Sequence, residues 1–444
     1  MGGLPRRATY IAQEKATEPE SLILDSGNFV TDRPLAEPSL DAVNAKTRLL
    51  VGAMERMGYS AAAIGEKDLN LGLDRLLTFS GATRVRFLSA NLTDDKGKTW
   101  FDPYLVARVG GISVGIIGLT GTPSDSRLLE QRAPGARIAD PLQAARKTVK
   151  EIREKCGLVV VLSNIGYSRD LELASSVPGI DIIVSGGTKR FMRRPLIQGR
   201  TLITSGYYEG RAVGRLAVQV DGPGKGWISK EEIQFMDKQI SEAEAGAGTP
   251  EGKAKHDALL EKRSAVRELT VYEPDMVNLD PSYPDDPQVV GMISDYRKEL
   301  KSTAAGSAAP AGFQDAQQVR YTGAEACGRC HEARYRFWQT TPHSEAFGAL
   351  APKEAEADPD CIGCHVTGYM RRTGYWPKAP REDLRGVQCE ACHGVGSLHI
   401  QDPQLYSLLH LPAAPQCMDC HTESQDDDFD YFRDRSLVCS EAIH

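Results

Sequence analysis

One short pattern, Cys-x-x-Cys-His, occurs four times in the last third of this 444-residue chain. The first cysteine and the histidine four residues later share a face of a helical turn, so two thiols and one imidazole can serve the same group. This arrangement suits haem of the c type, in which two thiols bond the porphyrin edge and the imidazole binds the iron. The first to fourth repeats are Cys327–His331, Cys361–His365, Cys389–His393 and Cys417–His421.

The four repeats predict four covalently bound haem c groups. The predicted attachment residues are Cys327, Cys330, Cys361, Cys364, Cys389, Cys392, Cys417 and Cys420. The predicted proximal iron ligands are His331, His365, His393 and His421. Roughly 120 residues leave little polypeptide core for four haems, so the macrocycles must supply much of the interior and lie close together. Closely packed redox centres are typical of electron transfer.

Zinc and disulfide bonds are the alternatives for paired cysteines. Zinc ribbons do not need a histidine directly after every cysteine pair. A disulfide between cysteines three residues apart would gain little from closing so short a loop. Four repeats that all carry the additional histidine therefore favour haem over both alternatives.

Five histidines lie outside the repeats: His256, His343, His399, His410 and His444. His256 lies in a charged helical stretch, where a surface position is expected. The other four follow the first repeat, and a second imidazole would close an open iron site into a low-spin centre. These four are the candidate distal ligands, whereas Met370 and Met418 are weaker candidates.

The sequence around the repeats resembles the cytochrome c-554 type of multihaem cytochrome. The similar stretches are Trp338–His343, Cys361–Tyr369 and Gly386–His399. The resemblance implies that His343 and His399 are distal ligands of haems other than their neighbours in sequence. Some members of this group leave one haem five-coordinate.

The end of the chain, Phe429–His444, resembles the tail of such cytochromes when they are fused to phosphoesterases. This makes His444 a third distal candidate, and His410 is the fourth.

The first 220 or so residues alternate short apolar runs with amphipathic stretches, which is typical of an α/β domain with a buried sheet. A helix is expected after a Ser39 cap, and another after Asp140 as N-cap with Pro141 in the first turn. Val106–Val109 and Ile112–Ile117 are expected to form a hairpin. Strands are expected at Leu22–Leu24, Ala62–Ile64, Leu158–Leu162, Ile180–Val184 and Leu202–Thr204.

Several segments of this region resemble the metallophosphoesterases of the 5'-nucleotidase group, and they follow that family's order. They are Gly2–Thr9, Leu24–Asn28, Met57–Tyr59, Gly65–Gly72, Leu88–Asn91, Val114–Gly118, Leu162–Gly166 and Gly179–Gly187. The resemblance implies a metallophosphoesterase-like α/β sandwich.

The departures from that family lie at its metal ligands. The family's bridging Asp corresponds to Asn28, and its Asn and catalytic His correspond to Glu66 and Lys67. Its later metal-binding histidines correspond to Asn164, Gly187 and Lys189. The first Asp-x-His motif has no counterpart. A two-metal hydrolase needs several imidazole and carboxylate ligands. We therefore expect an inactive domain without catalytic residues that lacks its first strand, with Lys67 and Lys189 placing positive charge in the vacated site.

These patterns predict three parts. Residues 1–225 form the phosphoesterase-like domain. Residues 226–320 form a helical connector and linker, because Glu, Lys, Gln and Ala dominate after residue 225 and an Ala-, Gly-, Ser- and Pro-rich stretch covers residues 302–312. Residues 321–444 form a mostly α-helical and irregular tetrahaem domain.

The expected function is electron transfer by an exported multihaem cytochrome, with the α/β domain as a scaffold or partner-binding module. Redox proteins are the expected donor and acceptor, and further copies of the chain are candidate partners. The alternatives are a haem enzyme whose one open iron acts on a small nitrogen or oxygen compound, and an active phosphoesterase coupled to a cytochrome.

The composition bears on the partners and the location. A net charge of -7 disfavours nucleic acid, and no apolar run is long enough to span a membrane. Haem is attached covalently outside the bacterial cytoplasm, so we expect a periplasmic or extracellular protein whose export signal lies upstream of Met1.

Overall fold

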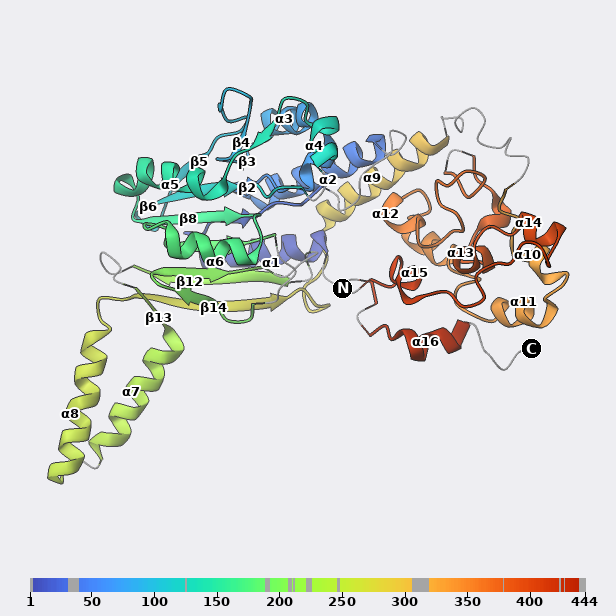
Figure 1. Cartoon of the computed structure of the whole chain (residues 1–444). Coiled ribbons are helices and arrows are strands. Elements are labelled where there is room, and N and C mark those ends of the chain that lie inside the picture. The colour runs from blue at the N-terminus through green and yellow to red at the C-terminus, as the bar shows by residue number, and fades with distance from the viewer. Residues whose placement is uncertain are drawn as a thin grey trace. The chain divides into compact units, whose positions relative to one another are not determined.

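The computed structural model describes two compact units, Met1–Met292 (unit 1) and Ile293–His444 (unit 2) (Figure 1). No described helix is both long enough and apolar enough to cross a membrane. The description covers every residue except 1–2, 31–39, 124–125, 188–191, 207–209, 211, 221–225, 246–247, 306–318, 378, 423–424, 427 and 439–444.

Unit 1 contains strands in four sheets. The strands are β1 (Leu24–Asp25), β2 (Ala61–Ala63), β3 (Arg86–Leu88), β4 (Leu92–Thr93), β5 (Tyr104–Val109), β6 (Ile112–Leu119), β7 (Arg137–Ile138), β8 (Leu158–Ser163), β9 (Ile182–Ser185), β10 (Leu196–Gln198), β11 (Thr201–Thr204), β12 (Ala212–Gln219), β13 (Trp227–Ser229) and β14 (Thr270–Asn278). The helices are α1 (Leu4–Thr17), α2 (Leu40–Met57), α3 (Leu73–Gly81), α4 (Ser126–Arg132), α5 (Pro141–Ile152), α6 (Tyr167–Ser176), α7 (Lys230–Glu244) and α8 (Pro250–Ala265), and α9 (Pro287–Ala305) continues into unit 2.

The largest sheet has the strand order β10-β11-β9-β8-β6-β5, in which β6, β8, β9 and β11 run parallel. Helices α5 and α6 pack on one face of it through Val149, Ile152 and Leu173. On the other face, a second apolar cluster joins it to the parallel β1-β2-β3 sheet and to β13 and β14. The carboxyl ends of the parallel strands in each sheet therefore meet at one edge, where α/β proteins usually place their sites.

The expected elements of this region are present. Strands β1, β2, β8, β9 and β11 overlap the five predicted strands. Strands β5 and β6 form the predicted hairpin, and Gly110 and Gly111 in its turn both have positive φ, which a two-residue turn of this kind requires. Asp140 caps α5 by accepting a hydrogen bond from the Gln143 N–H at 2.8 Å. Ser39 lies outside the described residues.

The region after residue 225 contains two strands as well as the expected helices. Strand β14 pairs with β12 over residues 271–278 and with β13 on its other side. The sequence pattern predicts only helices and linker here, because Glu273, Pro274 and Asp275 interrupt the apolar alternation and the partner β12 is far away in the chain. Helices α7 and α8 lie side by side and project away from this sheet (Figure 1).

Unit 2 consists of short helices joined by irregular segments. The helices are α10 (Ala324–Gly328), α11 (Glu332–Gln339), α12 (Pro359–Ile362), α13 (Cys389–His393), α14 (Ser397–Gln401), α15 (Ala414–Met418) and α16 (Tyr431–Val438). Their described apolar core is one small cluster: Tyr321, Leu350, Ala355, Ile362, Val366, Tyr375 and Leu384. Polypeptide alone therefore supplies little interior, as the sequence predicts for this part of the chain.

Candidate functional site

Each Cys-x-x-Cys-His repeat forms a tight helical turn in unit 2. In the first and fourth repeats, the histidine N–H donates to the carbonyl of the first cysteine at 2.9 Å. In the second repeat, the His365 N–H donates to the Ile362 carbonyl at 3.0 Å, and the third repeat coincides with α13. The eight cysteines of the repeats, all of which the structure describes, form no disulfide bond in it.

Two histidine pairs join parts of unit 2 that are far apart in sequence. The ring centroids of His331 and His399 lie 6.3 Å apart with nearly parallel planes, and those of His343 and His421 lie 6.0 Å apart. Two imidazoles on one metal have centroids roughly 6 Å apart, because each side contributes a nitrogen–metal bond of about 2 Å and a ring radius of about 1 Å. Both spacings therefore leave room for one iron between the rings.

The ring nitrogens of four histidines are oriented by hydrogen bonds. The contacts of Nδ1 are His365 to the Ala346 carbonyl (2.5 Å), His393 to the Leu409 carbonyl (2.5 Å), His399 to the Tyr406 carbonyl (2.7 Å) and His421 to the Asp426 carboxylate (2.7 Å). Carbonyl and carboxylate oxygens only accept, so Nδ1 carries the proton and donates. The other nitrogen, Nε2, then keeps its lone pair, which is the usual state of a metal-bound imidazole.

The first and third repeats lie next to each other. The thiols of Cys327 and Cys389 are hydrogen-bonded, and this contact lowers the pKa of Cys389 while it raises the pKa of Cys327. The closeness of the His331 and His399 rings connects the same two parts of the chain. Groups attached to these two repeats would therefore be neighbours.

His343 is a half-buried imidazole that favours the neutral form. Burial and, to a smaller extent, the nearby His421 lower the pKa of His343. A neutral imidazole is the form that binds a metal.

Three of the remaining candidate distal ligands are exposed or lie outside the described residues. His410 is exposed, Met418 is 57% exposed, and His444 lies outside the described residues. Among the residues that the structure describes, no histidine ring lies against that of His365.

Large apolar side chains are exposed around the third and fourth repeats. They are Ile400, Leu405, Tyr406, Leu409, Leu411, Met418, Phe432 and Leu437, which are 41 to 79% exposed. So many exposed apolar side chains in one short segment indicate a binding surface. A porphyrin is a flat apolar group that would cover them, so thiols, imidazoles and apolar surface together fit haem c.

The residues predicted to replace metal ligands in unit 1 follow strands β1, β2, β8 and β9, and the side chains of Asn28 and Asn164 join the loops there. The Asn28 Oδ1 accepts from the Lys67 N–H at 2.9 Å. The Asn164 amide accepts from the Glu66 N–H at 3.2 Å and donates to the Ser26 carbonyl at 3.1 Å. Burial raises the pKa of Glu66, and the neighbouring Lys67 opposes this shift. Asn28 and Asn164 thus link three loops through hydrogen bonds to backbone groups.

Asp68 is the buried centre of these loops. Its carboxylate accepts from the backbone N–H groups of Asn28 (2.8 Å), Val30 (2.9 Å) and Gly65 (2.8 Å). Burial raises its pKa to about 7, although the three donors pull in the opposite direction. Within the described part of the chain, no group of three or more His, Cys, Asp or Glu side chains could hold a bare metal ion. Lys189 lies outside that part.

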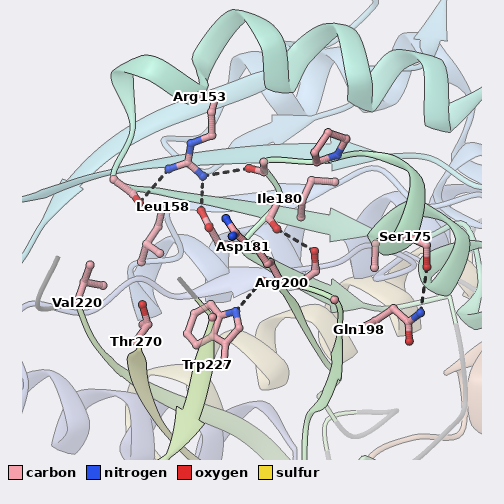
Figure 2. Close-up of a pocket in the computed structure, with 17 residues that line it drawn as sticks. Arg153, Leu158, Ser175, Ile180, Asp181, Gln198, Arg200, Val220, Trp227 and Thr270 are labelled. Carbon is pink, nitrogen blue, oxygen red and sulfur yellow. Dashed lines mark hydrogen bonds and ion pairs between the residues drawn. The ribbon is translucent and has the colours of Figure 1, made fainter. Parts of the chain in front are cut away.

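A cavity of about 640 Å³ opens at the opposite edge of the largest sheet, near the amino ends of β8 and β11 (Figure 2). Several of its polar side chains are engaged with the protein itself. Arg153 pairs with Asp181 and donates to the Gly179 carbonyl at 3.0 Å, and the Trp227 ring donates to the Arg200 carbonyl at 2.9 Å. The cavity is separate from Asn28, Glu66 and Asn164, none of which lines it.

The sequence gives no sign of most Nδ1 acceptors, because three of them are backbone carbonyls. Asp426 is the exception, since it lies five residues after His421 and could have been suspected from that spacing.

Comparison with known proteins gives different relatives for the two regions of the chain. The model of the family "Cytochrome c554 and c-prime" matches residues 326–394. Cytochrome c-554 of Nitrosomonas europaea is 35% identical over 96 residues, which cover 18% of this chain and 41% of that protein. Snake venom 5'-nucleotidase of Naja atra is 27% identical over 267 residues, which cover 54% of this chain and 49% of that protein. The chain thus spans about half or less of the length of these relatives.

A solved structure shows the same fold. The 5'-nucleotidase precursor from Thermus thermophilus has a TM-score of 0.51 at 22% identity, over 83% of this chain and 63% of that one. This likeness shows the metallophosphoesterase-like α/β fold of the N-terminal region. The chain is therefore a fusion of a region similar to 5'-nucleotidase-type metallophosphoesterases with a segment of the multihaem cytochrome c-554 type.

Proposed function

We propose that this protein is an exported electron carrier that holds four haem c groups, and that its phosphoesterase-like region serves as a scaffold or partner-binding module. The observation that carries the proposal is the pair of histidine contacts at 6.3 and 6.0 Å. Each pair combines the histidine of one repeat with a histidine from a distant segment. Two imidazole ligands per iron give low-spin centres, which suit electron transfer.

In this proposal the chain's own residues bind and orient the haems. The eight thiols of the repeats anchor the porphyrin edges, and the bound iron supplies one-electron chemistry. His331 and His399 would together hold one iron, and His421 and His343 would together hold another. Hydrogen bonds from Nδ1 of His399 and His421 would keep these two rings in orientation and make their Nε2 atoms stronger donors.

The exchange of ligands between segments also keeps the haems close together. The distal ligand of the first haem follows the third repeat, and that of the fourth haem follows the first repeat. The first and fourth repeats would then each be connected, through an iron, to a segment that follows another repeat. His410 and His444 remain the candidates for the second and third haems.

The phosphoesterase-like region is proposed to be inactive, because the side chains at its replaced ligand positions are engaged in loop hydrogen bonds. It would bind the electron donor, the acceptor or a second copy of the chain. Because haem c is attached outside the bacterial cytoplasm, the protein is proposed to be periplasmic or extracellular.

The test is a haem count with spin-state analysis on the full chain, expressed in a host that matures c-type cytochromes. We expect a mass increase of four haems and a mainly low-spin ferric absorption spectrum. A product with no added haem would overturn the proposal.

A second function is favoured by one observation, namely that no described imidazole faces His365. The haem of the second repeat would then keep an open iron face for a small nitrogen or oxygen compound. A high-spin band that shifts on adding nitric oxide or nitrite would support this haem enzyme. A spectrum that does not respond to either compound would support the pure carrier.

The third alternative, an active phosphoesterase, is tested separately. Hydrolysis of nucleoside monophosphates that a chelator abolishes would support it, as would two manganese ions bound near Asn28 in a soaked crystal. We expect neither result, because Asn28 and Asn164 already bond to neighbouring loops.

A further inference from the structure

Glu390 lies between the two cysteines of the third repeat and is almost completely buried, with 3% of its surface exposed. One carboxylate oxygen accepts from the N–H groups of Thr322 (2.9 Å) and Gly323 (2.8 Å). The other accepts from the Gly396 N–H (2.7 Å) and the Thr322 hydroxyl (3.2 Å). All these donors are neutral, so the hydrogen bonds must compensate the loss of water around a buried charge.

The donors belong to two different segments. Thr322 and Gly323 lead directly into α10, which carries the start of the first repeat. Gly396 directly precedes α14, which carries His399. Because Glu390 is itself part of the third repeat, one carboxylate connects the first repeat, the third repeat and a distal-ligand segment.

A neighbouring side chain supports the same connection. Gln388 accepts from the Ala324 N–H at 2.6 Å and donates to the Asp383 and Arg385 carbonyls at 2.9 and 2.8 Å. The residues on both sides of Cys389 therefore bind the beginning of α10. This explains why the thiols of the first and third repeats are in contact.

We infer that Glu390 is a positioning residue of the haem-binding segment, whose buried carboxylate sets the spacing between the first and third haem attachment turns and directs His399 toward the iron held by His331. The inference rests on the proposed function. Glu390 acts through the Gly396 backbone and the loop that begins α10.

The experiment compares E390Q with wild type in the full haem-loaded chain. An amide has the size of the carboxylate but only one accepting oxygen, so its NH2 must face the N–H donors of one of the two segments. We expect four haems by mass, loss of the low-spin signature from one of them, and a positive shift of at least one midpoint potential because a buried negative charge is gone.

Two further variants keep the inference falsifiable. E325Q is the matched control, because Glu325 is an exposed carboxylate on α10, and it should have the wild-type spectrum and potentials. E390D keeps the charge but is one methylene shorter and cannot reach both segments. It should lose the low-spin signature of one haem, as E390Q does, although it keeps the charge, and it carries the test if E390Q does not fold.

Four haems with wild-type spin state and potentials in both Glu390 variants would overturn the inference and leave the proposed function intact. A wild-type protein without four haems would instead overturn the proposed function. The two failures are therefore distinguishable in one set of samples.

Discussion

Removal of the two paired distal histidines gives the sharpest test of the proposed haem arrangement. H399A leaves His331 without the ring that lies 6.3 Å away, and H343A leaves His421 without the ring 6.0 Å away. If one iron lies in each space, each variant makes one of four haems five-coordinate. The high-spin fraction should then rise by about one quarter in each single variant and about one half in the double variant, because the two pairs share no iron.

The assay is electron paramagnetic resonance of the oxidised protein, supported by the room-temperature absorption spectrum and normalised to total haem. H256A is the control, because His256 lies on α8 outside the haem-binding segment. Unchanged low-spin intensity in both single variants would refute the reasoning. So would a double variant that is no more affected than a single one, since the two histidines would then serve the same iron.

Three further predictions concern other parts of the chain. D426N weakens the acceptor of the His421 Nδ1–H, so the midpoint potential of one haem should rise in a redox titration, whereas D428N should have no such effect. Asp68 has a folded-state pKa of about 7, which is above its pKa in an unfolded chain. Between these two pKa values the folded form binds a proton that the unfolded form has lost. Unit 1 should therefore lose stability as the pH rises from 4 to 7. D68N should remove a contribution on the order of 4 kcal/mol from that pH dependence, as measured by denaturant unfolding at several pH values. L162A, at a fully buried position in β8, should lower the free energy of unfolding by about 2 to 5 kcal/mol in the same assay, and a smaller loss would mean that the two sheets do not pack around it.

Asp68 in unit 1 and Glu390 in unit 2 play the same structural role. Buried polar side chains connect segments that are far apart in sequence, and each connection satisfies backbone N–H groups at a loop. In unit 1 these connections occupy the edge of the sheet where related folds place their sites. In unit 2 they bring the cysteine-histidine turns together.

Local patterns were enough to predict much of the fold. The spacing of apolar residues located β1, β2, β8, β9 and β11, and Gly110-Gly111 marked the β5–β6 turn. The same holds for the haem-binding turns, because the two cysteines and the histidine of a repeat lie within one helical turn. Such features depend on residues three or four apart, and the sequence displays that distance directly.

Long-range pairing was decided only by the tertiary structure. The sequence named His343 and His399 as distal candidates, but only the folded chain places them beside His421 and His331. The partner of β14 and the donors to Glu390 were hidden for the same reason, since they belong to loops and strands distant along the chain. A side chain's type shows which contacts it can make, whereas the packing of segments determines which of them it makes.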